Sequence, residues 1–253
     1  MAEKEMEKIV KQANSIFKLF GKCKEFEDLQ NDVINSQNPE LIYMFAVGVE
    51  GADIPALQKA LQETCSLKYM LKFAQEVKDA DVEEMSRVVA ADKFPVFYYL
   101  IGFAELPGAD RYALAKAIAD TDNIDYIVKF SLILHKGDEE AYALISSAVA
   151  KYAVKYNDGA LAYRFLKRSP SIFSKFMIDA LVKIGDPKFL YLASQLPEIE
   201  MVYDLQALQE AMVKTGSFEY VEKLAENVEW ADKVYLYKNL AKVYKEKNEE
   251  LEG

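Results

Sequence analysis

Residues 45–53 read FAVGVEGAD, and the pattern returns as FAQEVKDAD at residues 73–81 and as FAELPGAD at residues 103–110. In each copy a Phe-Ala pair precedes an Asp that closes the pattern, and an apolar residue follows four positions after that Asp. Two later copies keep part of it, namely Phe130 with Gly137-Asp138, and Leu224-Ala225 with Ala231-Asp232. Self-similarity at a nearly fixed period is typical of repeat architectures. The chain therefore carries five recognisable copies of one unit.

The first copy indicates how one unit folds. Its apolar residues are spaced i, i+3, i+4 and i+7, which places them on one face of a helix: Ile42, Phe45, Ala46 and Val49. Gly51 permits a left-handed helix end, and Asp53 can accept a backbone N–H as the cap of a second helix. We interpret each unit as a helical hairpin with one series of capping residues: Asp53, Asp81, Asp110, Asp138 and Asp232.

Seven such hairpins fit the chain. We expect them at residues 39–65, 66–92, 93–121, 122–153, 154–185, 186–216 and 217–247. Because a unit this short cannot bury its apolar stripe alone, the hairpins must stack on one another. Helices at 2–20 and 24–36 would form an N-terminal helical cap (1–37) before the hairpins (38–247) and a frayed tail (248–253). The sequence thus predicts an all-α chain, a single domain over 1–253 built as an α-solenoid of antiparallel hairpins.

Polar residues at the unit boundaries predict where the first helix of each hairpin begins. Asn38 and Asp186 each precede a proline, which is favoured at the first position of a helix. The expected caps of other first helices are Ser66, Asp122 and Ser217. The pattern is weakest over residues 154–216, where we expect second helices to start near Ser169-Pro170 and Asp204.

The composition excludes several classes of function. A formal net charge of −10 and a pI of about 4.9 oppose general attraction to nucleic acid or to an anionic membrane. Cys23 and Cys65 are too few for a disulfide framework or a four-thiolate metal site, although one bond between them stays open. The start of the chain shows no secretory signal pattern. We therefore expect a cytoplasmic protein with no membrane partner.

The residues needed for familiar catalytic chemistry are scarce. His135 is the only histidine and precedes a Gly-Asp turn, so we interpret it as the end of a hairpin and not as a base or a metal ligand. No phosphate-binding glycine pattern occurs. The many carboxylates leave an acid–base pair open, but the recurring Asp series is explained by capping. The sequence predicts a protein that is not an enzyme, with no metal and no cofactor.

Tyrosine is abundant, with 16 residues, and several of them follow the repeat. The tyrosines that lie four residues before the first-helix anchor of their unit are Tyr69, Tyr99, Tyr126 and Tyr220. We expect these rings to pack between neighbouring hairpins, with the hydroxyl at the solvent edge.

One segment departs from the acidic background. Residues 151–183 hold seven Lys or Arg and two Asp, a net charge of +5. Like charges four residues apart slightly destabilise a helix and so invite a functional reason. The candidate binding residues, for a partner or an anion, are Lys151, Lys155, Tyr156, Tyr163, Arg164, Lys167 and Arg168. The alternative is that these bases pair with acidic residues of adjacent units.

The pattern FA-x-x-V-x-GAD-x-x-x-L-x-x-A-[LI]-x-x-T resembles short HEAT-like helical repeats of about 28 residues, found in tandem in uncharacterised bacterial and bacteriophage proteins. The resemblance spans residues 39–247 and is clearest in the first four hairpins and the last. It implies an α-solenoid and protein binding, with no active site to transfer. A bacteriophage setting would favour inhibition of a host or defence protein.

We therefore expect a non-enzymatic scaffold or inhibitor that grips a partner protein in the groove of a helical arc. Two alternatives stay open. The chain could bind a small anionic ligand, such as a nucleotide, at residues 151–183. It could also act as an acidic mimic of nucleic acid, because the rest of the chain carries −15 once the +5 segment is subtracted from −10.

Overall fold

The computed structural model of the chain describes residues 3–92, 96–135, 137–168, 174–197, 199 and 205–252, with side chains up to Lys245. These residues form sixteen α-helices and no strand, so the prediction of an all-α chain is confirmed. The predicted helix starts near Ser169-Pro170 and Asp204 lie outside the described residues. The contacts divide the chain into two compact units, one of residues 1–121 and 132–141 and the other of residues 122–131 and 142–253.

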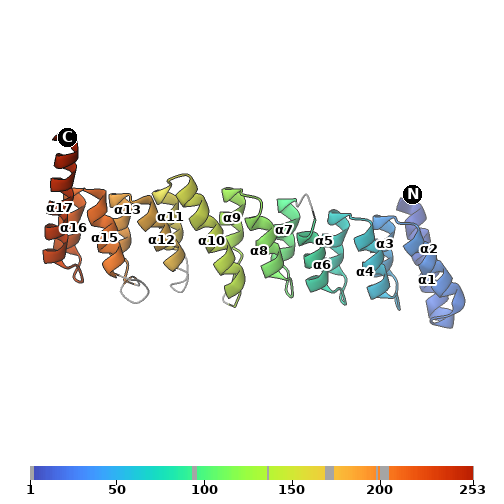
Figure 1. The fold of residues 1–253 in the computed structure, drawn as a ribbon. Coiled ribbons are helices and arrows are strands. Elements are labelled where there is room, and N and C mark those ends of the chain that lie inside the picture. The colour runs from blue at the N-terminus through green and yellow to red at the C-terminus, as the bar shows by residue number, and fades with distance from the viewer. Residues whose placement is uncertain are drawn as a thin grey trace. The chain divides into compact units, whose positions relative to one another are not determined.

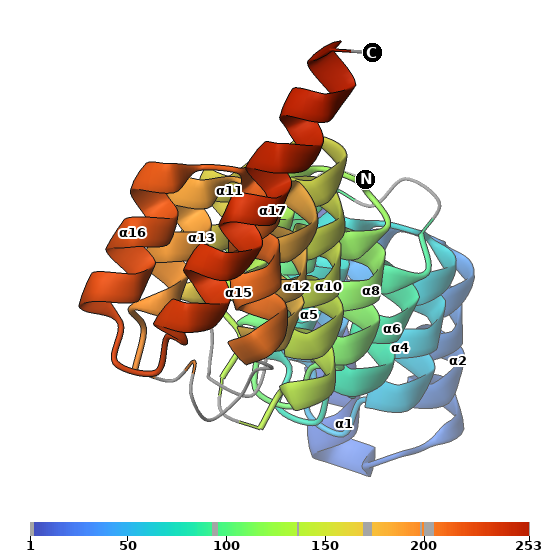
Figure 2. The same ribbon diagram turned by 60° about the vertical axis from the view of Figure 1, so that its left-hand side comes forward.

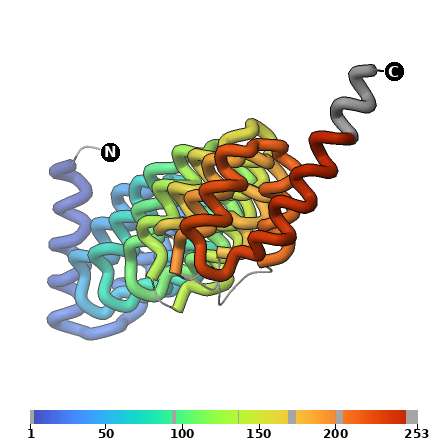
Figure 3. Tube along the Cα trace, turned by 90° about the vertical axis from the view of Figure 1, so that its left-hand side faces the viewer, coloured from blue at the N-terminus to red at the C-terminus, as the bar shows by residue number. Residues whose placement is uncertain are grey.

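The first unit consists of consecutive helical hairpins (Figure 1). Its helices are α1 (Glu3–Phe20), α2 (Lys24–Asn35), α3 (Pro39–Gly48), α4 (Ile54–Glu63), α5 (Leu67–Glu76), α6 (Val82–Ala90), α7 (Phe97–Ala104) and α8 (Arg111–Ala119). Helix α3 packs against α4 and α5, α5 packs against α6 and α7, and α6 packs against α8. The Cα trace of this unit passes up and down once per hairpin (Figure 3).

The second unit repeats this arrangement. Its helices are α9 (Ile124–Ser131), most of α10 (Glu139–Lys155), α11 (Gly159–Leu166), α12 (Ser174–Ile184), α13 (Pro187–Ser194), α15 (Leu205–Thr215), α16 (Phe218–Asn227) and α17 (Lys233–Glu252). Figure 2 shows α11, α13 and α16 in one layer and α12, α15 and α17 in the other. Helix α17 continues to Glu252, so the backbone of the predicted frayed tail is helical as far as that residue. We call the first helix of each hairpin its A helix and the second its B helix.

A phenylalanine of the A helix anchors each early hairpin. Phe45, Phe73, Phe103 and Phe130 are fully buried, as the spacing of the Phe-Ala pairs predicts. Burying one such ring contributes about 1.5–3 kcal/mol relative to leaving it exposed. The hairpins are therefore held together mainly by these rings and by the aliphatic residues of the B helices.

Four of the five predicted Asp caps bond as expected. The carboxylate of each accepts the backbone N–H three residues later, at distances of 3.2, 2.9, 2.9 and 2.9 Å for Asp53, Asp81, Asp110 and Asp232. Asn38 and Asp186 also cap their helices. Asp138 instead accepts the N–H of His135 at 2.8 Å. This bond ties the single histidine's backbone to the turn before α10.

Of the other three predicted caps, Asp122 is wrong, and Ser66 and Ser217 occupy the N-cap positions without a capping bond from their side chains. The hydroxyls of Thr64 and Thr215 accept the serine N–H groups at 3.3 and 3.1 Å. At the fourth boundary the amide oxygen of Asn123 accepts the N–H of Tyr126 at 3.3 Å. Asp122 itself has a φ of +52° and belongs to the turn. A threonine at the end of the preceding B helix therefore bonds the backbone at the two serine junctions, whereas Asn123 caps α9 directly.

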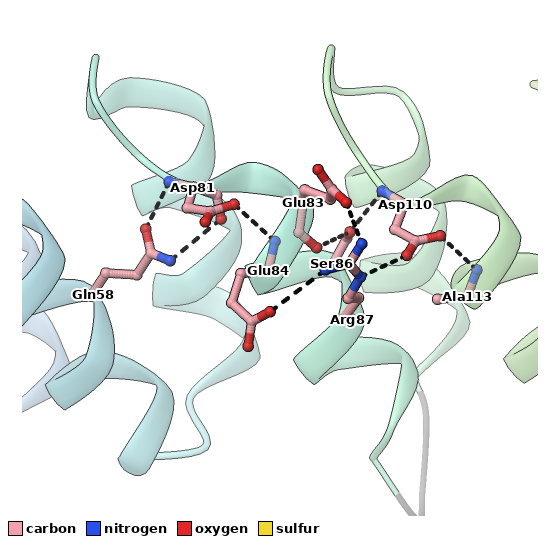
Figure 4. Close-up of polar contacts among 8 residues, drawn as sticks. All are labelled: Gln58, Asp81, Glu83, Glu84, Ser86, Arg87, Asp110 and Ala113. Atoms are coloured by element: carbon pink, nitrogen blue, oxygen red, sulfur yellow. Dashed lines mark hydrogen bonds and ion pairs between the residues drawn. The ribbon is translucent and has the colours of Figure 1, made fainter.

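A buried polar side chain of one B helix binds the backbone at the start of the next B helix (Figure 4). Gln58 accepts the N–H of Asp81 at 2.8 Å and donates to its carbonyl at 3.3 Å. The N–H acceptors at the equivalent positions are Gln30 for Asp53 (2.9 Å), Ser86 for Asp110 (2.8 Å) and Gln209 for Asp232 (2.7 Å). We call these four contacts the polar ladder. It satisfies backbone groups that would otherwise be buried without partners.

Replacing Gln58 by alanine should lower the free energy of unfolding by about 1–3 kcal/mol, because the N–H of Asp81 loses its acceptor, while the Asp81 carbonyl keeps the N–H of Met85. Gln62→Ala, one turn later in α4, is the matched control, since its amide nitrogen is buried without a partner among the described residues. Urea unfolding followed by circular dichroism measures both variants. An equal loss in the two would show that the ladder bond adds nothing.

The N-terminal helix α1 docks on the turn between α3 and α4. Asn14 donates to the carbonyl of Gly48 at 2.6 Å and accepts the N–H of Glu50 at 3.0 Å. The ring of Phe17 lies 5.4 Å from that of Phe26 and covers Gly51. These polar and apolar contacts fix α1 to one turn.

Cys23 and Cys65 are both free thiols, so the bond that the sequence left open between them is not formed. Within the described ranges no helix has the length and apolar content that a membrane crossing requires.

Candidate functional site

The B helices share one register, which fixes which residues face solvent. Each carries a fully buried anchor: Leu57, Met85, Leu114, Ile145, Met177, Leu208 and Leu236. The residue four positions after each anchor is also buried. The residue six positions after the anchor is exposed in all seven helices. Side chains at this position therefore form the outer surface of successive B helices.

The predicted residues Lys151 and Lys155 line a pocket of about 410 Å³ between α10 and α12. Lys183 lines it from α12, and its apolar part comes from side chains that include Val154 and Phe176. Lys155 Nζ lies 2.6 Å from Asp122 Oδ2 in the turn before α9. The hydrogen bond to Asp122 raises the pKa of Lys155. The pocket is therefore cationic, but one of its lysines is already paired.

The remaining predicted residues are on a different surface. Tyr163 packs its ring 6.1 Å from that of Phe189 on α13, and Lys167 Nζ lies 5.9 Å from the centre of the Tyr163 ring. Arg164 and Arg168 are exposed on and just after α11, and neither forms an ion pair within the described part of the chain. None of these four residues lines the pocket of Lys151. The structure thus divides the predicted site into two groups.

Tyr156 lies outside the pocket of Lys151 and contacts residues close to it in the chain. Its ring packs against that of Tyr152 with centroids 4.3 Å apart, and Lys155 Nζ lies 5.1 Å from the centre of the Tyr156 ring. The local pairing of Lys155 with Asp122 and Tyr156 supports the alternative interpretation for this lysine, in which basic residues pair with their neighbours.

A second pocket of about 400 Å³ lies between α12 and α15. Lys183 lines this pocket as well, together with Lys214 and Glu210. Its apolar lining comes from Val182, Ala207 and Ala211. Lys183 therefore stands between two neighbouring hollows along the B helices of the second unit.

Lys183 belongs to a row that the sequence patterns did not reveal. At the exposed position six residues after the anchor, the second unit carries lysine in every B helix: Lys151, Lys183, Lys214 and Lys242. We call these four residues the lysine row. The same position in the first unit holds Glu63, Ala91 and Asp120. Alignment of the B helices on their buried anchors would have found the row, whereas a search for contiguous basic segments finds only its first half.

The A helices carry two matching aromatic contacts. In the first unit Tyr43 and Tyr69 lie 5.9 Å apart, and Lys72 Nζ lies 5.5 and 5.6 Å from the two ring centres. In the second unit the rings of Tyr191 and Tyr220 lie 6.1 Å apart. The prediction that Tyr69 and Tyr220 pack between neighbouring hairpins is confirmed.

The pKa of Tyr43 is raised at this contact by burial and by a neighbouring carboxylate. Burial raises the pKa of Tyr43 to about 12, and its hydrogen bond of 2.5 Å to Glu76 acts in the same direction. The neutral phenol is therefore stabilised, and the tyrosine acts as a hydrogen-bond donor between α3 and α5.

A pocket of about 750 Å³ in the first unit holds the other two arginines of the chain. Arg87 donates to Asp110 at 2.7 Å and also pairs with Glu83, while Arg111 lies 3.5 Å from Asp138. Burial raises the pKa of Asp110, but hydrogen bonds from the Ala113 N–H and from Arg87 outweigh it and leave this pKa below its ordinary value. Both arginines are occupied by carboxylates of the same pocket, so it offers no free cation.

No group of three or more His, Cys, Asp or Glu side chains in the described residues could hold a metal ion. Comparison of the chain with family models, with curated proteins and with solved structures finds no match.

Proposed function

We propose that the hairpins of the two units form one continuous α-solenoid, and that this solenoid is a non-enzymatic scaffold or inhibitor that binds a partner protein in the cytoplasm. The HEAT-like pattern of the sequence supports the fold, because hairpins of this length bury their apolar faces only by stacking. Successive hairpins also pack against one another within the units, as α3 does against α5 and α13 against α16.

One observation carries the proposal of protein binding. The B helices keep the same buried anchors, yet the exposed position six residues later changes from acidic or neutral in the first unit to lysine throughout the second. A residue at that position does not contribute to the core. Exposed positions that vary while the core stays fixed are how repeat scaffolds present a binding surface.

Affinity capture from the source cell, followed by mass spectrometry, tests this function. We expect one protein to be recovered in amounts comparable to the bait and to co-migrate with it in gel filtration. A bacteriophage origin of the chain would make a host or defence protein the expected partner. Repeated recovery of the bare chain, at low as well as physiological salt, would contradict the proposal.

A further inference from the structure

The lysine row is the most ordered charged feature of the second unit. Its members recur at intervals of 32, 31 and 28 residues, once per hairpin, on α10, α12, α15 and α17. Helix α12 packs against α15, and α15 packs against α17. Neighbouring packed helices lie about 8–10 Å apart. The row therefore places one ammonium group about every 10 Å along the B helices.

Helix stability does not explain the row. Lys183 and Lys214 lie in the last turn of their helices and gain from the helix dipole by about 0.3–1 kcal/mol, whereas Lys242 lies well before the end of α17 and gains no such stabilisation. The first unit, however, has Glu63 and Asp120 at the same position, so the fold does not require a cation there. None of the four lysines forms an ion pair with any residue whose side chain the structure describes. The four lysines are therefore not fixed by ion pairs, although Asp179 and Glu210 line the same hollows.

The surface between the lysines is partly apolar and also holds one carboxylate in each hollow, Asp179 in the first and Glu210 in the second. The hollow between Lys151 and Lys183 is lined in part by Val154 and Phe176, and the hollow between Lys183 and Lys214 by Val182 and Ala207. Each has a volume of about 400 Å³, enough for one or two side chains. The surface thus alternates lysines with hollows that are partly apolar.

We propose that the lysine row binds an extended acidic segment of a partner polypeptide, in which carboxylates recur about every third residue with apolar side chains between them. A polyproline II chain has three residues per turn and rises about 3.1 Å per residue, so every third side chain returns to the same face about 9 Å from the last. That spacing matches the lysines, and the intervening apolar side chains fit the hollows. The inference deepens the proposed function and rests on it for the identity of a natural partner.

Polypeptide is favoured over nucleic acid by the charges of the whole chain. A net charge of −10 opposes any anionic partner, and it opposes the dense charge of a phosphate backbone more strongly than the sparse charge of a short acidic segment. Lysine also lacks the planar guanidinium group with which arginine donates two parallel hydrogen bonds to a phosphate.

Two charge-reversed variants of equal net charge test the row. Lys183→Glu/Lys214→Glu reverses its centre, and Arg164→Glu/Arg168→Glu reverses two exposed arginines outside both hollows. The main probe is a fluorescein-labelled peptide of about twelve residues with the repeat Glu-Leu-Ser, which in a polyproline II conformation presents its acids on one face about 9 Å apart. The comparison probes are a peptide of the same composition with its four Glu contiguous, an oligo-dT of about the same length, and ATP. Binding is measured by fluorescence anisotropy at low salt and near 0.15 M salt.

We expect the spaced peptide to bind the wild-type chain more tightly than the contiguous one. The lysine variant should weaken this binding at least about tenfold, and the arginine variant by less than about twofold. Unchanged thermal unfolding of both variants confirms that they fold. Equal weakening by the two variants would overturn the proposal, because net charge alone would then explain the binding. Tighter binding of oligo-dT or ATP that depends on the row would overturn it in favour of a nucleic acid or a nucleotide.

The capture experiment separates this inference from the proposed function. A partner that is captured equally well by the wild type and by the lysine variant would support the scaffold function and contradict the proposed role of the lysine row. Row-dependent peptide binding without any captured partner would support the row and count against the scaffold function.

Discussion

Replacement of Phe73 by alanine is expected to lower the free energy of unfolding by about 3–5 kcal/mol, a large share of the about 5–15 kcal/mol of a typical domain. The ring is fully buried in α5, and this helix packs against α3, α4, α6 and α7. A cavity at this point therefore loosens the hairpins on both sides. Urea unfolding at several protein concentrations, followed by far-UV circular dichroism, measures the loss.

Phe20→Ala is the control for this prediction. It removes the same side chain from the end of α1, where the residue is 71% exposed. We expect a change within about 0.5 kcal/mol, because exposed substitutions away from special features have small effects. Similar losses for Phe73→Ala and Phe20→Ala would show that the phenylalanine anchors do not carry the core.

The second large effect is expected for Gly51→Ala. Gly51 has a φ of +78°, and a Cβ there would lie 2.1 Å from Cε2 of Phe17. The left-handed conformation costs an alanine about 1–2 kcal/mol, and displacement of the Phe17 ring adds about 1–3 kcal/mol of overpacking. Since Phe17 belongs to α1, the substitution should also loosen that helix. Hydrogen exchange of α1 amides and urea unfolding measure the two consequences.

Gly108 provides a matched comparison for Gly51. It occupies the same turn position in the third hairpin with a φ of +81°, but a Cβ added there would meet no described heavy atom within 4 Å. Gly108→Ala should therefore cost only the conformational part, about 1–2 kcal/mol. Adding Phe17→Leu to Gly51→Ala should recover part of the loss, whereas it should not help Gly108→Ala. Equal losses in the two glycine variants would contradict the clash.

The sequence predicted the features that local patterns encode. The spacing of the Phe-Ala pairs identified the buried anchors, and the Asp that closes each pattern identified the caps of most B helices. At the fourth boundary the sequence pattern predicted Asp122 as the cap, whereas Asn123 caps α9. The spacing of apolar residues does not distinguish two adjacent polar residues in a turn. The stacking of all hairpins into one solenoid stays a prediction.

Those sequence patterns could not predict the side-chain contacts between hairpins. The bond from Gln58 to Asp81 joins residues 23 apart, and a glutamine in a helix gives no sign of which backbone it will meet. The pairing of Lys155 with Asp122 over 33 residues is of the same kind. For the candidate site, residues 151–183 were chosen as a contiguous basic segment. The surface is instead arranged once per hairpin, so the segment captured Lys151, missed Lys214 and included Arg164, which lies elsewhere.

The polar ladder also bears on how this chain can change in length. Its bonds span 23 residues in three cases and 24 in the fourth, where the shorter Ser86 replaces glutamine. Where the ladder is interrupted, Ala115 stands in place of a polar side chain, and the buried Ser146 hydroxyl has no partner among the described residues. Insertions and deletions should therefore be poorly tolerated between Gln30 and Asp110, because a hydrogen bond of the polar ladder fixes the length of chain between successive B helices there. They should accumulate between Asp138 and Gln209, where the hairpins are already longer and the described residues form no such bond.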